Sequence, residues 1–275
     1  MAKCVEMVSV GNELLIGKTL NTNAKWLAKR ITSLGLSVSR ITVIGDDVKE
    51  IVKALREAVH RSPDFIITTG GLGPTFDDKT LVGIAEAFGF KLQVNKKALK
   101  MVEEKYVAYA EGMGHEKFEL TPARVKMAKI PEGAEPLPNP VGTAPAITIR
   151  NNKVIVFALP GVPSEMKAIF ENSLSPVLKA ASGNLTFFET SLYVSGVMES
   201  EMAPLIDQVM HDNPYVYIKS HPMGAEEKPR IELHLSTTAE DAETAKKRVC
   251  RALIQLSEVV KAKGGKTKTA KAETR

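Results

Sequence analysis

The sequence predicts an α/β protein in which a large domain with a mainly parallel sheet precedes a smaller α/β domain. In the N-terminal part, short apolar runs alternate with amphipathic helical patterns, which is typical of βαβ units. A glycine-rich loop directly follows one of these apolar runs. Towards the other end, the order strand, helix, strand, strand, helix predicts a small βαββα sandwich. Ser182-Gly183 marks the boundary, so we expect domains over 1–180 and 184–260.

The first elements of the large domain are indicated by their apolar spacing and their end signals. An apolar run over 4–10 predicts a strand, and a loop over 11–17 follows it. Asn21 or Thr22 can cap the next helix, whose apolar residues recur three and four positions apart, and Gly35 can end it. The elements expected after this helix are a strand over 36–44, a helix over 48–60, a strand over 65–69 and a helix over 79–88.

The rest of the chain gives weaker signals, and its elements are expected mainly from β-rich runs and helical periodicity. In the large domain we expect a helix over 96–111, a loop over 115–121, strands over 125–130, 146–149 and 154–158, a linker over 131–139, and a helix that opens within 159–166 and reaches 179. In the small domain we expect strands over 185–194, 216–219 and 230–236, and helices over 199–211 and 239–260.

The composition is that of a globular protein with a substantial core. Of the 275 residues, 44% are hydrophobic and 25% are charged, which is ordinary for such proteins. The formal net charge of +5 comes from residues 261–275, which hold six basic residues and one acidic residue. The body of the chain therefore has no basic bias towards nucleic acid. The tail over 261–275 has no apolar residue larger than alanine, and we expect it to be disordered.

Cysteine usage and hydropathy indicate the compartment. Cys4 and Cys250 are the two cysteines, and neither belongs to a CxxC pair, so no disulfide framework or zinc site is expected. The N-terminus shows no signal-peptide pattern, and no apolar run reaches the ~18 residues of a membrane span. We expect a cytoplasmic protein that does not enter a membrane.

The glycine-rich loop Gly70-Gly71-Leu72-Gly73-Pro74-Thr75-Phe76-Asp77-Asp78 is the most informative motif. Its glycines let the backbone turn sharply and approach a ligand, and Asp77 or Asp78 can cap the helix that follows. A strand, a glycine loop and a helix N-terminus together favour phosphate. Two carboxylates beside a phosphate also suggest Mg²⁺. The alternative is an ordinary turn between strand and helix with an aspartate cap.

Acidic residues follow three strands of the expected parallel sheet. Glu13 comes after the first strand, Asp46 and Asp47 after the second, and Asp77 and Asp78 after the third. Because the carboxyl ends of parallel strands meet at one edge, these side chains are expected to gather there. Such a cluster beside a glycine loop suits a metal-bound phosphate ester or anhydride. The alternative is that each acid merely caps a helix.

Two later loops are candidates for the remainder of the site. One is the run 139–145, with Asn139, Gly142 and Thr143, and the other is the run 159–165, with Gly161 and Ser164. Either could be simple turn chemistry. Other catalytic classes lack their motifs, because the chain has no GxSxG serine, no GxxxxGK[ST] loop and no histidines at metal-ligand spacing.

Several motifs, in order along the chain, resemble the CinA family. They are Gly11-Asn12-Glu13-Leu14-Leu15, Gly45-Asp46-Asp47, GGLGPTFDD, Asn139-Pro140-Val141-Gly142-Thr143-Ala144-Pro145, LPGVPSEM and Gly196-Val197-Met198-Glu199-Ser200. The first part of that family is similar to the molybdopterin-binding MogA/MoaB fold. The resemblance implies a three-layer α/β domain, a small KH-like α/β domain and a homodimer.

The resemblance also implies activities. CinA proteins are associated with the cleavage of ADP-ribose to AMP and ribose 5-phosphate, with a divalent cation and potassium. MogA-like relatives bind molybdopterin and help to adenylylate it. By motif match, the aspartates considered catalytic fall on Asp46 and Asp78. Leu72 and Asp77 stand where the molybdopterin relatives usually have Thr and Arg, which favours the CinA-like interpretation. The deamidase domain of full-length CinA is missing here, so that activity is not expected.

We therefore expect a metal-dependent nucleotide pyrophosphatase or, as the alternative, a molybdopterin- or nucleotide-binding protein of molybdenum-cofactor metabolism. Asp46 and Asp78 are the expected catalytic residues, and Asp46, Asp77 and Asp78 are the expected ligands of Mg²⁺ or another divalent cation. The expected ligand-binding residues are Glu13, Asn21, Gly70, Gly71, Gly73, Pro74, Thr75, Asn139, Gly142, Thr143, Gly161 and Ser164. The expected partners are a small nucleotide or nucleotide-sugar and a second copy of the chain. Nucleic acid is not expected, because residues 199–219 contain no GxxG clamp.

Overall fold

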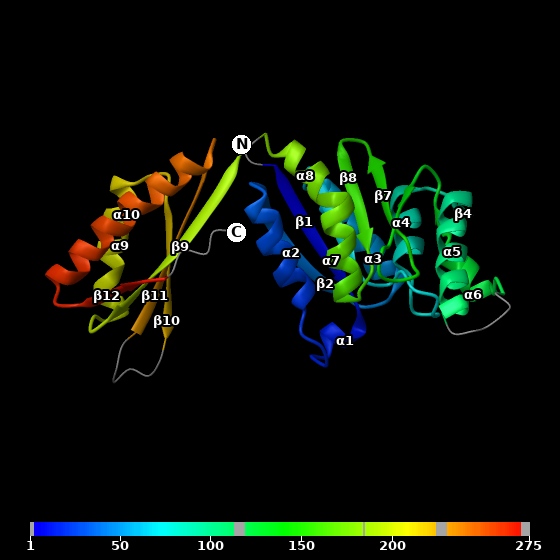
Figure 1. The fold of residues 1–275 in the computed structure, drawn as a ribbon, viewed down its shortest axis with the longest axis horizontal. Helices are drawn as coiled ribbons and strands as arrows, with labels where there is room; N and C mark the ends of the chain where they lie inside the picture. The colour runs from blue at the N-terminus through cyan, green and yellow to red at the C-terminus, as the bar shows by residue number, and fades with distance from the viewer. Residues whose placement is uncertain (1–2, 113–118, 184, 224–229, 271–275) are drawn as a thin grey trace. The chain divides into compact units, whose positions relative to one another are not determined.

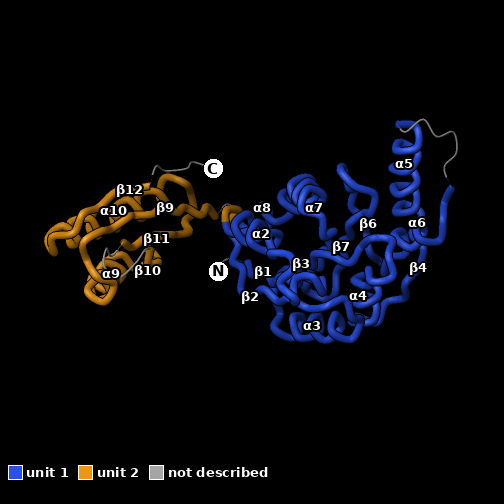
Figure 2. The backbone as a smooth tube through the Cα atoms, turned by 90° about the horizontal axis from the view of Figure 1, so that it is seen from below, with its two compact units in different colours: residues 1–32, 36–182 blue, residues 33–35, 183–275 orange. Residues whose placement is uncertain are grey.

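The computed structural model describes residues 3–112, 119–183, 185–223 and 230–270. The chain divides into two compact units (Figure 2). Unit 1 comprises Met1–Thr32 and Leu36–Ser182, and unit 2 comprises Ser33–Gly35 and Gly183–Arg275. Each unit has its own sheet and its own core, so each is described by itself.

Unit 1 is a three-layer sandwich around a mainly parallel sheet, which confirms the expected fold class. The sheet has the strand order β2-β1-β3-β8-β7-β6. Its parallel strands are β1 (Cys4–Val10), β2 (Ser37–Ile44), β3 (Phe65–Thr69) and β8 (Val154–Leu159). Strand β7 (Ala146–Asn151) runs antiparallel to β8 and to β6 (Glu135–Leu137).

Helices cover both faces of this sheet (Figures 1 and 2). One face carries α3 (Val48–His60) and α4 (Thr80–Phe88), and the other carries α2 (Thr22–Ser33), α7 (Pro163–Ile169) and α8 (Ser175–Ala181). A short helix α1 (Asn12–Leu15) follows β1. The remaining elements are β4 (Leu92–Val94), α5 (Lys96–Gly112), α6 (Pro122–Lys126) and β5 (Lys129–Pro131).

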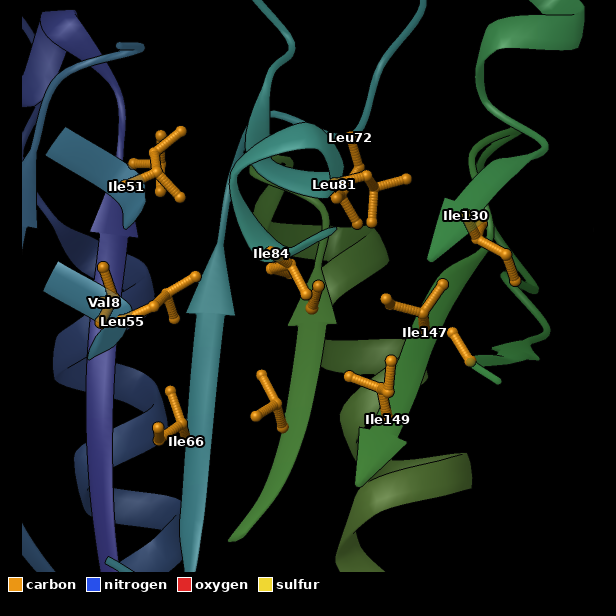
Figure 3. Close-up of a cluster of buried hydrophobic side chains, with 14 of the residues drawn as sticks. Val8, Ile51, Leu55, Ile66, Leu72, Leu81, Ile84, Ile130, Ile147 and Ile149 are labelled. Carbon is orange, nitrogen blue, oxygen red and sulfur yellow. The ribbon is translucent and has the colours of Figure 1, made fainter. Parts of the chain in front are cut away.

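The core on the α3 and α4 side is made of aliphatic side chains that alternate along the strands (Figure 3). Val8 of β1 and Ile66 of β3 meet Ile51 and Leu55 of α3, and all four are at most 2% exposed. Leu72, from the loop after β3, belongs to the same cluster. Each such side chain contributes roughly 1.5–3 kcal/mol of burial free energy, so the sheet and the loop at its end are held by one core.

A helix cap explains why part of the strand expected over 125–130 is helical. A strand was expected over 125–130, but α6 occupies the beginning of that stretch and β5 starts at Lys129. The Thr121 side chain accepts a hydrogen bond from the Arg124 N–H, and Pro122 occupies the first helical turn, a combination that starts a helix despite the β-branched residue inside it. The linker expected over 131–139 contains β6, and part of the loop expected over 115–121 lies outside the described residues.

The helix expected to reach 179 is also divided. It begins at Pro163 and is interrupted by a π-helical segment, η1 (Phe170–Leu174), before α8 continues. Phe170 is fully buried there and packs edge-to-face on the Trp26 ring of α2 at a centroid distance of 5.3 Å. Such an extra backbone residue within a helix changes which side chains face the core.

Unit 2 is an antiparallel sheet backed by two helices. Its elements are β9 (Thr186–Ser195), α9 (Glu199–Asp212), β10 (Tyr217–Met223), β11 (Arg230–Ala239), α10 (Ala242–Ala262) and β12 (Lys266–Thr269). The strand order is β10-β11-β9-β12. The expected βαββα run is present, and a further strand completes a βαββαβ unit of the ferredoxin-like kind.

Strand β12 corrects the expectation of a disordered tail over 261–275. Gly264 adopts a φ of +83° and, with Gly265, turns the chain after α10. Lys266 to Thr269 then pair with β9, and the Thr267 hydroxyl lies 3.0 Å from that of Ser257 on α10. Backbone pairing to an existing strand gives this polar segment a structure that apolar content alone would not predict. Residues 271–275 lie outside the described part of the chain.

Glu6 is a carboxylate inside the sheet and depends on one partner. Its side chain is 4% exposed, and Arg61 binds it in a bidentate pair with distances of 2.8 Å and 2.7 Å. Removing one partner of a buried pair leaves an uncompensated charge. We expect Arg61→Ala to lower the free energy of unfolding by about 3 kcal/mol in urea denaturation.

An exposed pair just before β1 and β3 provides the control. Lys3 binds Asp64 at 2.7 Å, but both side chains are at least 34% exposed. Lys3→Ala should therefore change the free energy of unfolding by less than about 1 kcal/mol. Equal effects of the two substitutions would contradict the assignment of Glu6 as a buried charge.

Candidate functional site

A cavity of about 430 Å³ lies in unit 1 beyond the carboxyl ends of the parallel strands. The loops that follow β1, β2, β3 and β8 all contribute to its lining, as the sequence predicts for ligand sites in parallel sheets. The predicted site residues that line it are Glu13, Asn21, Asp46, Gly70, Gly71, Gly73, Pro74, Asp77, Asp78, Thr143 and Gly161. Thr75, Asn139, Gly142 and Ser164 were also predicted, but they are not part of the lining.

The glycine turn at the end of β3 has its shape because larger side chains would not fit. Gly70 has a φ of +98°, and a Cβ atom there would lie 2.2 Å from the Val10 carbonyl oxygen. Gly71 has a φ of +69°, and a Cβ atom would lie 2.3 Å from the Thr80 hydroxyl. That hydroxyl donates to the Gly70 carbonyl at 2.8 Å. The turn is thus fixed between β1 and the start of α4, and its backbone borders the cavity directly.

The loop after the glycine turn folds back on itself through Thr75. The Asp78 carboxylate accepts hydrogen bonds from the Thr75 N–H at 2.8 Å and from the Thr75 hydroxyl at 2.6 Å, and the same hydroxyl contacts Asp77. Neither aspartate caps α4, whose cap residue is Lys79 with no side-chain hydrogen bond, so that expectation was wrong. A hydroxyl has one proton to donate. Two carboxylates therefore share one donor at the cavity.

Lys126 of α6 is a functional candidate that the sequence interpretation missed. Its ammonium group donates to the Thr75 carbonyl and lies near Asp78 and Asp77. Burial lowers the pKa of Lys126, and these two aspartates act in the opposite direction. The residue was assigned to a strand, so no signal placed it beside the glycine loop. Its contact ties α6 to the acidic loop.

Asp46 sits on the β2 side of the cavity. Its carboxylate accepts a hydrogen bond from the Asn12 N–H at the start of α1 at 2.8 Å. The neighbouring Asp47 instead caps α3 by accepting from the Lys49 and Glu50 N–H groups, so for Asp47 the helix-cap alternative is correct. Two adjacent aspartates thus have different roles, one at the cavity and one in the helix.

The carboxylates do not form the metal centre expected from Asp46, Asp77 and Asp78. Within the described residues, no three or more His, Cys, Asp or Glu side chains are grouped so that they could hold a metal ion. The hydrogen bonds explain this, because Asp46 is held by Asn12 and Asp78 is turned towards Thr75 of its own loop. Asp77 and Asp78 alone meet at a common hydroxyl.

Glu165 adds a carboxylate that the sequence interpretation did not select. It lines the cavity from α7, and its Oε2 accepts a hydrogen bond from the Asn139 amide at 2.6 Å. Asn139 also accepts from the N–H groups of Val141 and Gly142. A Cβ atom on Gly142 would lie 2.2 Å from the Glu165 carboxyl. Asn139 and Gly142 do not line the cavity. Instead, they fix the position of the Glu165 carboxylate, which does.

Two asparagine side chains near the cavity follow β1, and the sequence predicts a role for one of them, Asn21. Asn21 donates to the Ser9 hydroxyl at 2.9 Å and caps α2 through the Ala24 N–H. Asn23, which was not selected, lines the cavity and donates to the Gly161 carbonyl at 2.7 Å. Its Oδ1 is buried and has no hydrogen-bond partner. An unpaired buried oxygen is uncommon in folded proteins, so Asn23 is a second missed candidate.

The Thr75 hydroxyl is expected to set the ionisation of Asp77. The hydrogen bond from Thr75, with further help from Lys126 and Lys79, holds the pKa of Asp77 below its usual range. Stability linked to this group is present above the unfolded pKa and is lost as the pH falls through the lowered folded pKa. We expect Thr75→Val to raise the pKa of Asp77 towards the ordinary value, measured by NMR titration of the carboxyl carbon. Thr75→Ser should keep it low, and an unchanged pKa in Thr75→Val would contradict the assignment.

Gly142→Ala is expected to displace Glu165 from Asn139. Loss of a charge-assisted hydrogen bond should lower the free energy of unfolding by about 2 kcal/mol. In a Glu165→Ala background the same change should cost much less, because the clash is gone. Gly161→Ala is the matched control, since its Cβ would meet the Gly70 Cα at 3.4 Å, an ordinary contact. If Gly142→Ala lowers the free energy of unfolding equally with and without Glu165, then Gly142 has a role other than making room for the Glu165 carboxylate.

Comparisons with known proteins agree with this architecture. Residues 6–180 match the family described as probable molybdopterin binding domain. A protein of Pyrobaculum arsenaticum is 47% identical over 260 residues, which are 94% of this chain and 95% of that protein. A protein of Sulfurisphaera tokodaii is 43% identical over 261 residues, 94% of this chain and 96% of that protein.

A solved structure is similar as well. The crystal structure of the protein CinA from Thermoplasma acidophilum is 41% identical with a TM-score of 0.57, and the match covers 64% of this chain and 98% of that one. The resemblance drawn from the sequence motifs is therefore confirmed. In addition, no helix among the described residues is both long and apolar enough to cross a membrane. The chain belongs to the family of the probable molybdopterin binding domain, and its N-terminal part is similar to CinA.

Proposed function

We propose that the chain is a pyrophosphatase that cleaves a nucleoside-diphosphate sugar, with ADP-ribose as the first substrate to test. The observation that supports this proposal is the shared lining of one cavity by the glycine turn and by carboxylates from separate loops. A diphosphate needs a site where backbone can approach its oxygens and where acidic groups can orient water or hold a cation. The cavity volume of about 430 Å³ is within the range of small-ligand sites.

The glycine turn is the proposed phosphate-binding part. At Gly70, Gly71 and Gly73 no side chain separates the backbone from the cavity, and α4 begins at Thr80, whose N–H donates to the Gly71 carbonyl at 3.1 Å. The Gly70 N–H donates to the Leu159 carbonyl at 3.0 Å, so the proposed donors are the N–H groups of 71–73. Backbone N–H groups near a helix N-terminus favour anions. The positions also exclude larger residues on steric grounds, so the approach of a phosphate to this backbone depends on glycine.

The carboxylates are the proposed reactive part. One of Asp46 and Asp78 accepts a proton from a water molecule whose oxygen attacks phosphorus. The bond between that phosphorus and the bridging oxygen breaks, and the leaving phosphate takes the bridging oxygen. Positioned general bases of this kind contribute about 10²–10⁴-fold to the rate. Glu165 is a further carboxylate at the same cavity.

The carboxylates of Asp77 and Asp78 are too few to hold a divalent cation alone, so the substrate phosphates would supply further ligands. Mg²⁺ is usually held by one or two carboxylates plus substrate phosphates rather than by a cage of protein ligands. Asp77 and Asp78, which meet at the Thr75 hydroxyl, would hold it, and the cation would neutralise charge on the diphosphate. Lys126, close to both aspartates, provides a positive charge of the protein's own.

A second candidate function is the binding of molybdopterin or a nucleotide without turnover. The match of residues 6–180 to the probable molybdopterin binding domain favours it. The same glycine turn would then hold the terminal phosphate of the pterin. The two functions differ in one measurable respect, because only the first releases AMP.

The test is incubation of the purified chain with ADP-ribose and Mg²⁺, Mn²⁺ or Co²⁺, with AMP measured by chromatography. We expect AMP to form, and we expect Asp78→Asn and Asp46→Asn each to lower kcat by about 10²-fold or more. Asp47→Asn is the matched control, because Asp47 caps α3 and asparagine also caps helices well. It should keep the native rate.

Calorimetry separates the alternatives. Binding of ADP-ribose or AMP without AMP production would overturn the pyrophosphatase and leave the binding function. Absence of binding to these nucleotides, with tight binding of molybdopterin, would assign the pterin function. AMP production that is unchanged in both Asp78→Asn and Asp46→Asn would contradict the roles given to these residues.

A further inference from the structure

The sheet of unit 2 has one face covered by helices and one face open. Helix α10 packs on β9 and β11, and α9 packs on β10; Figure 1 shows both helices on the same side of the strands. The side chains that point to the helices are apolar and buried, as in Leu192, Ile218 and Leu233. Because side chains alternate along a strand, the residues between them form the other face. We call these outward residues the open face.

Flat rings lie on three of the four strands of the open face. Tyr193 on β9 is 39% exposed and Tyr217 on β10 is 60% exposed. His221 is exposed on β10, and His234 lies on the central strand β11. The register places Tyr193 opposite Glu232, and Glu232 opposite His221, so two of the rings belong to one row across the sheet.

Positive charges surround these rings. Lys268 pairs with Tyr193 and Lys266 with Ser195 in the register of β12 and β9, and Lys219 pairs with His234. Arg230 also falls on the open face, since it alternates with the buried Ile231. The lysines of the open face and Arg230 are all exposed.

The acidic residues of unit 2 are mostly elsewhere. Among the residues that the structure describes, the open face has two carboxylates: Glu189 lies 3.3 Å from His234, and Glu232 accepts a hydrogen bond from Ser191 at 2.6 Å. The other acidic residues that the structure describes in this unit come from α9, α10 and the short segment before α10: Glu199, Glu201, Asp207, Asp212, Glu240, Asp241, Glu243 and Glu258. Helix α9 is acidic, whereas α10 carries Lys246, Lys247, Arg248, Arg251 and Lys261 against Glu243 and Glu258. Among the described residues, the open face is therefore a basic surface, with Lys219, Arg230, Lys266 and Lys268 against two carboxylates, but it is not the only basic part of the unit.

We propose that the open face binds single-stranded nucleic acid, with bases stacked on Tyr193 and Tyr217 and phosphates beside Lys219, Lys266 and Lys268. An antiparallel four-stranded sheet with exposed aromatic rings offers platforms on which unpaired bases can stack, and lysines at its edge neutralise the phosphates between them. A duplex does not expose its base faces, so it cannot use such platforms. The missing GxxG clamp excludes a KH type of contact and leaves this one unaffected.

Strand β12 gives two lysines of the basic tail a fixed position on the open face. The same lysines that made the tail look like a disordered basic end are placed by strand pairing beside Tyr193. Part of the positive charge of residues 261–275 therefore lies on the folded sheet and not in a disordered tail. The expectation that nucleic acid is not a partner rested on the missing GxxG clamp, which a stacking surface does not need.

The experiment uses the full chain and fluorescein-labelled oligonucleotides of about 12 nucleotides, followed by fluorescence anisotropy at low salt. Single-stranded RNA, single-stranded DNA and a duplex of the same sequence are compared. We expect the native chain to bind one or both single strands more tightly than the duplex. The comparison of RNA with DNA identifies which of them is preferred.

Variants separate stacking from general charge attraction. The double substitution Tyr193→Ala with Tyr217→Ala should weaken single-strand binding by about tenfold or more, whereas Tyr193→Phe with Tyr217→Phe should preserve it. Lys266→Gln with Lys268→Gln should reduce the slope of log K against log salt by about 0.7 for each lysine. Lys246→Gln with Lys247→Gln on α10 is the charge-matched control, and it should leave binding unchanged. Thermal unfolding by circular dichroism shows that each variant is folded.

Three results would overturn the proposal. The native chain could fail to bind single strands more tightly than the duplex at low salt. The tyrosine-to-alanine pair could leave binding unchanged while the α10 lysines weaken it as much as those of β12, which would indicate adsorption by charge alone. Sedimentation could show that the tyrosine-to-alanine pair dissociates a dimer that does not bind nucleic acid, which would assign the open face to self-association.

Discussion

The turn formed by Gly70 and Gly71 is the constraint on which the cavity of unit 1 depends. It is confined between the Val10 carbonyl at the end of β1 and the Thr80 hydroxyl at the start of α4. Leu72 is buried in the core below, so the loop cannot move outward without exposing apolar surface. The Gly70 N–H donates to the carbonyl of Leu159, the last residue of β8, at 3.0 Å. Three neighbouring connections are thus fixed relative to one another by backbone contact.

The carboxylates around this turn are arranged by hydrogen bonds rather than by a common ligand. Asp46, Asp78 and Glu165 are each held by a different partner, respectively the Asn12 N–H, Thr75 and the Asn139 amide. All three also line the cavity, so an incoming group can reach each of them. The proposed diphosphate would meet these acidic groups in the cavity, and a divalent cation bound to it would offset the repulsion between them.

The spacing of apolar residues predicts the strands and helices of the parallel sheet, and the order of these elements predicts which loops share an edge. Contacts between residues far apart in the sequence are not predicted. Glycine-bounded apolar runs such as 65–69 suffice for a parallel sheet, and a parallel sheet brings Glu13, Asp46 and Asp78 to one edge. No local pattern places Glu165 beside Gly142, because the fit between them exists only after folding. The Thr121-Pro122 cap outweighs the β-branched Val125, and β12 forms because β9 offers a free edge, not because its own residues are apolar.

A crystal structure of the chain soaked with AMP would show directly whether the glycine turn binds phosphate. We expect the phosphate oxygens to lie within hydrogen-bond distance of backbone N–H groups between Gly71 and Gly73, with the Asp46 and Asp78 carboxylates in the same cavity. Density for AMP at another place on the chain, or a glycine turn whose N–H groups are all bound by the protein's own atoms while AMP sits apart from them, would contradict it.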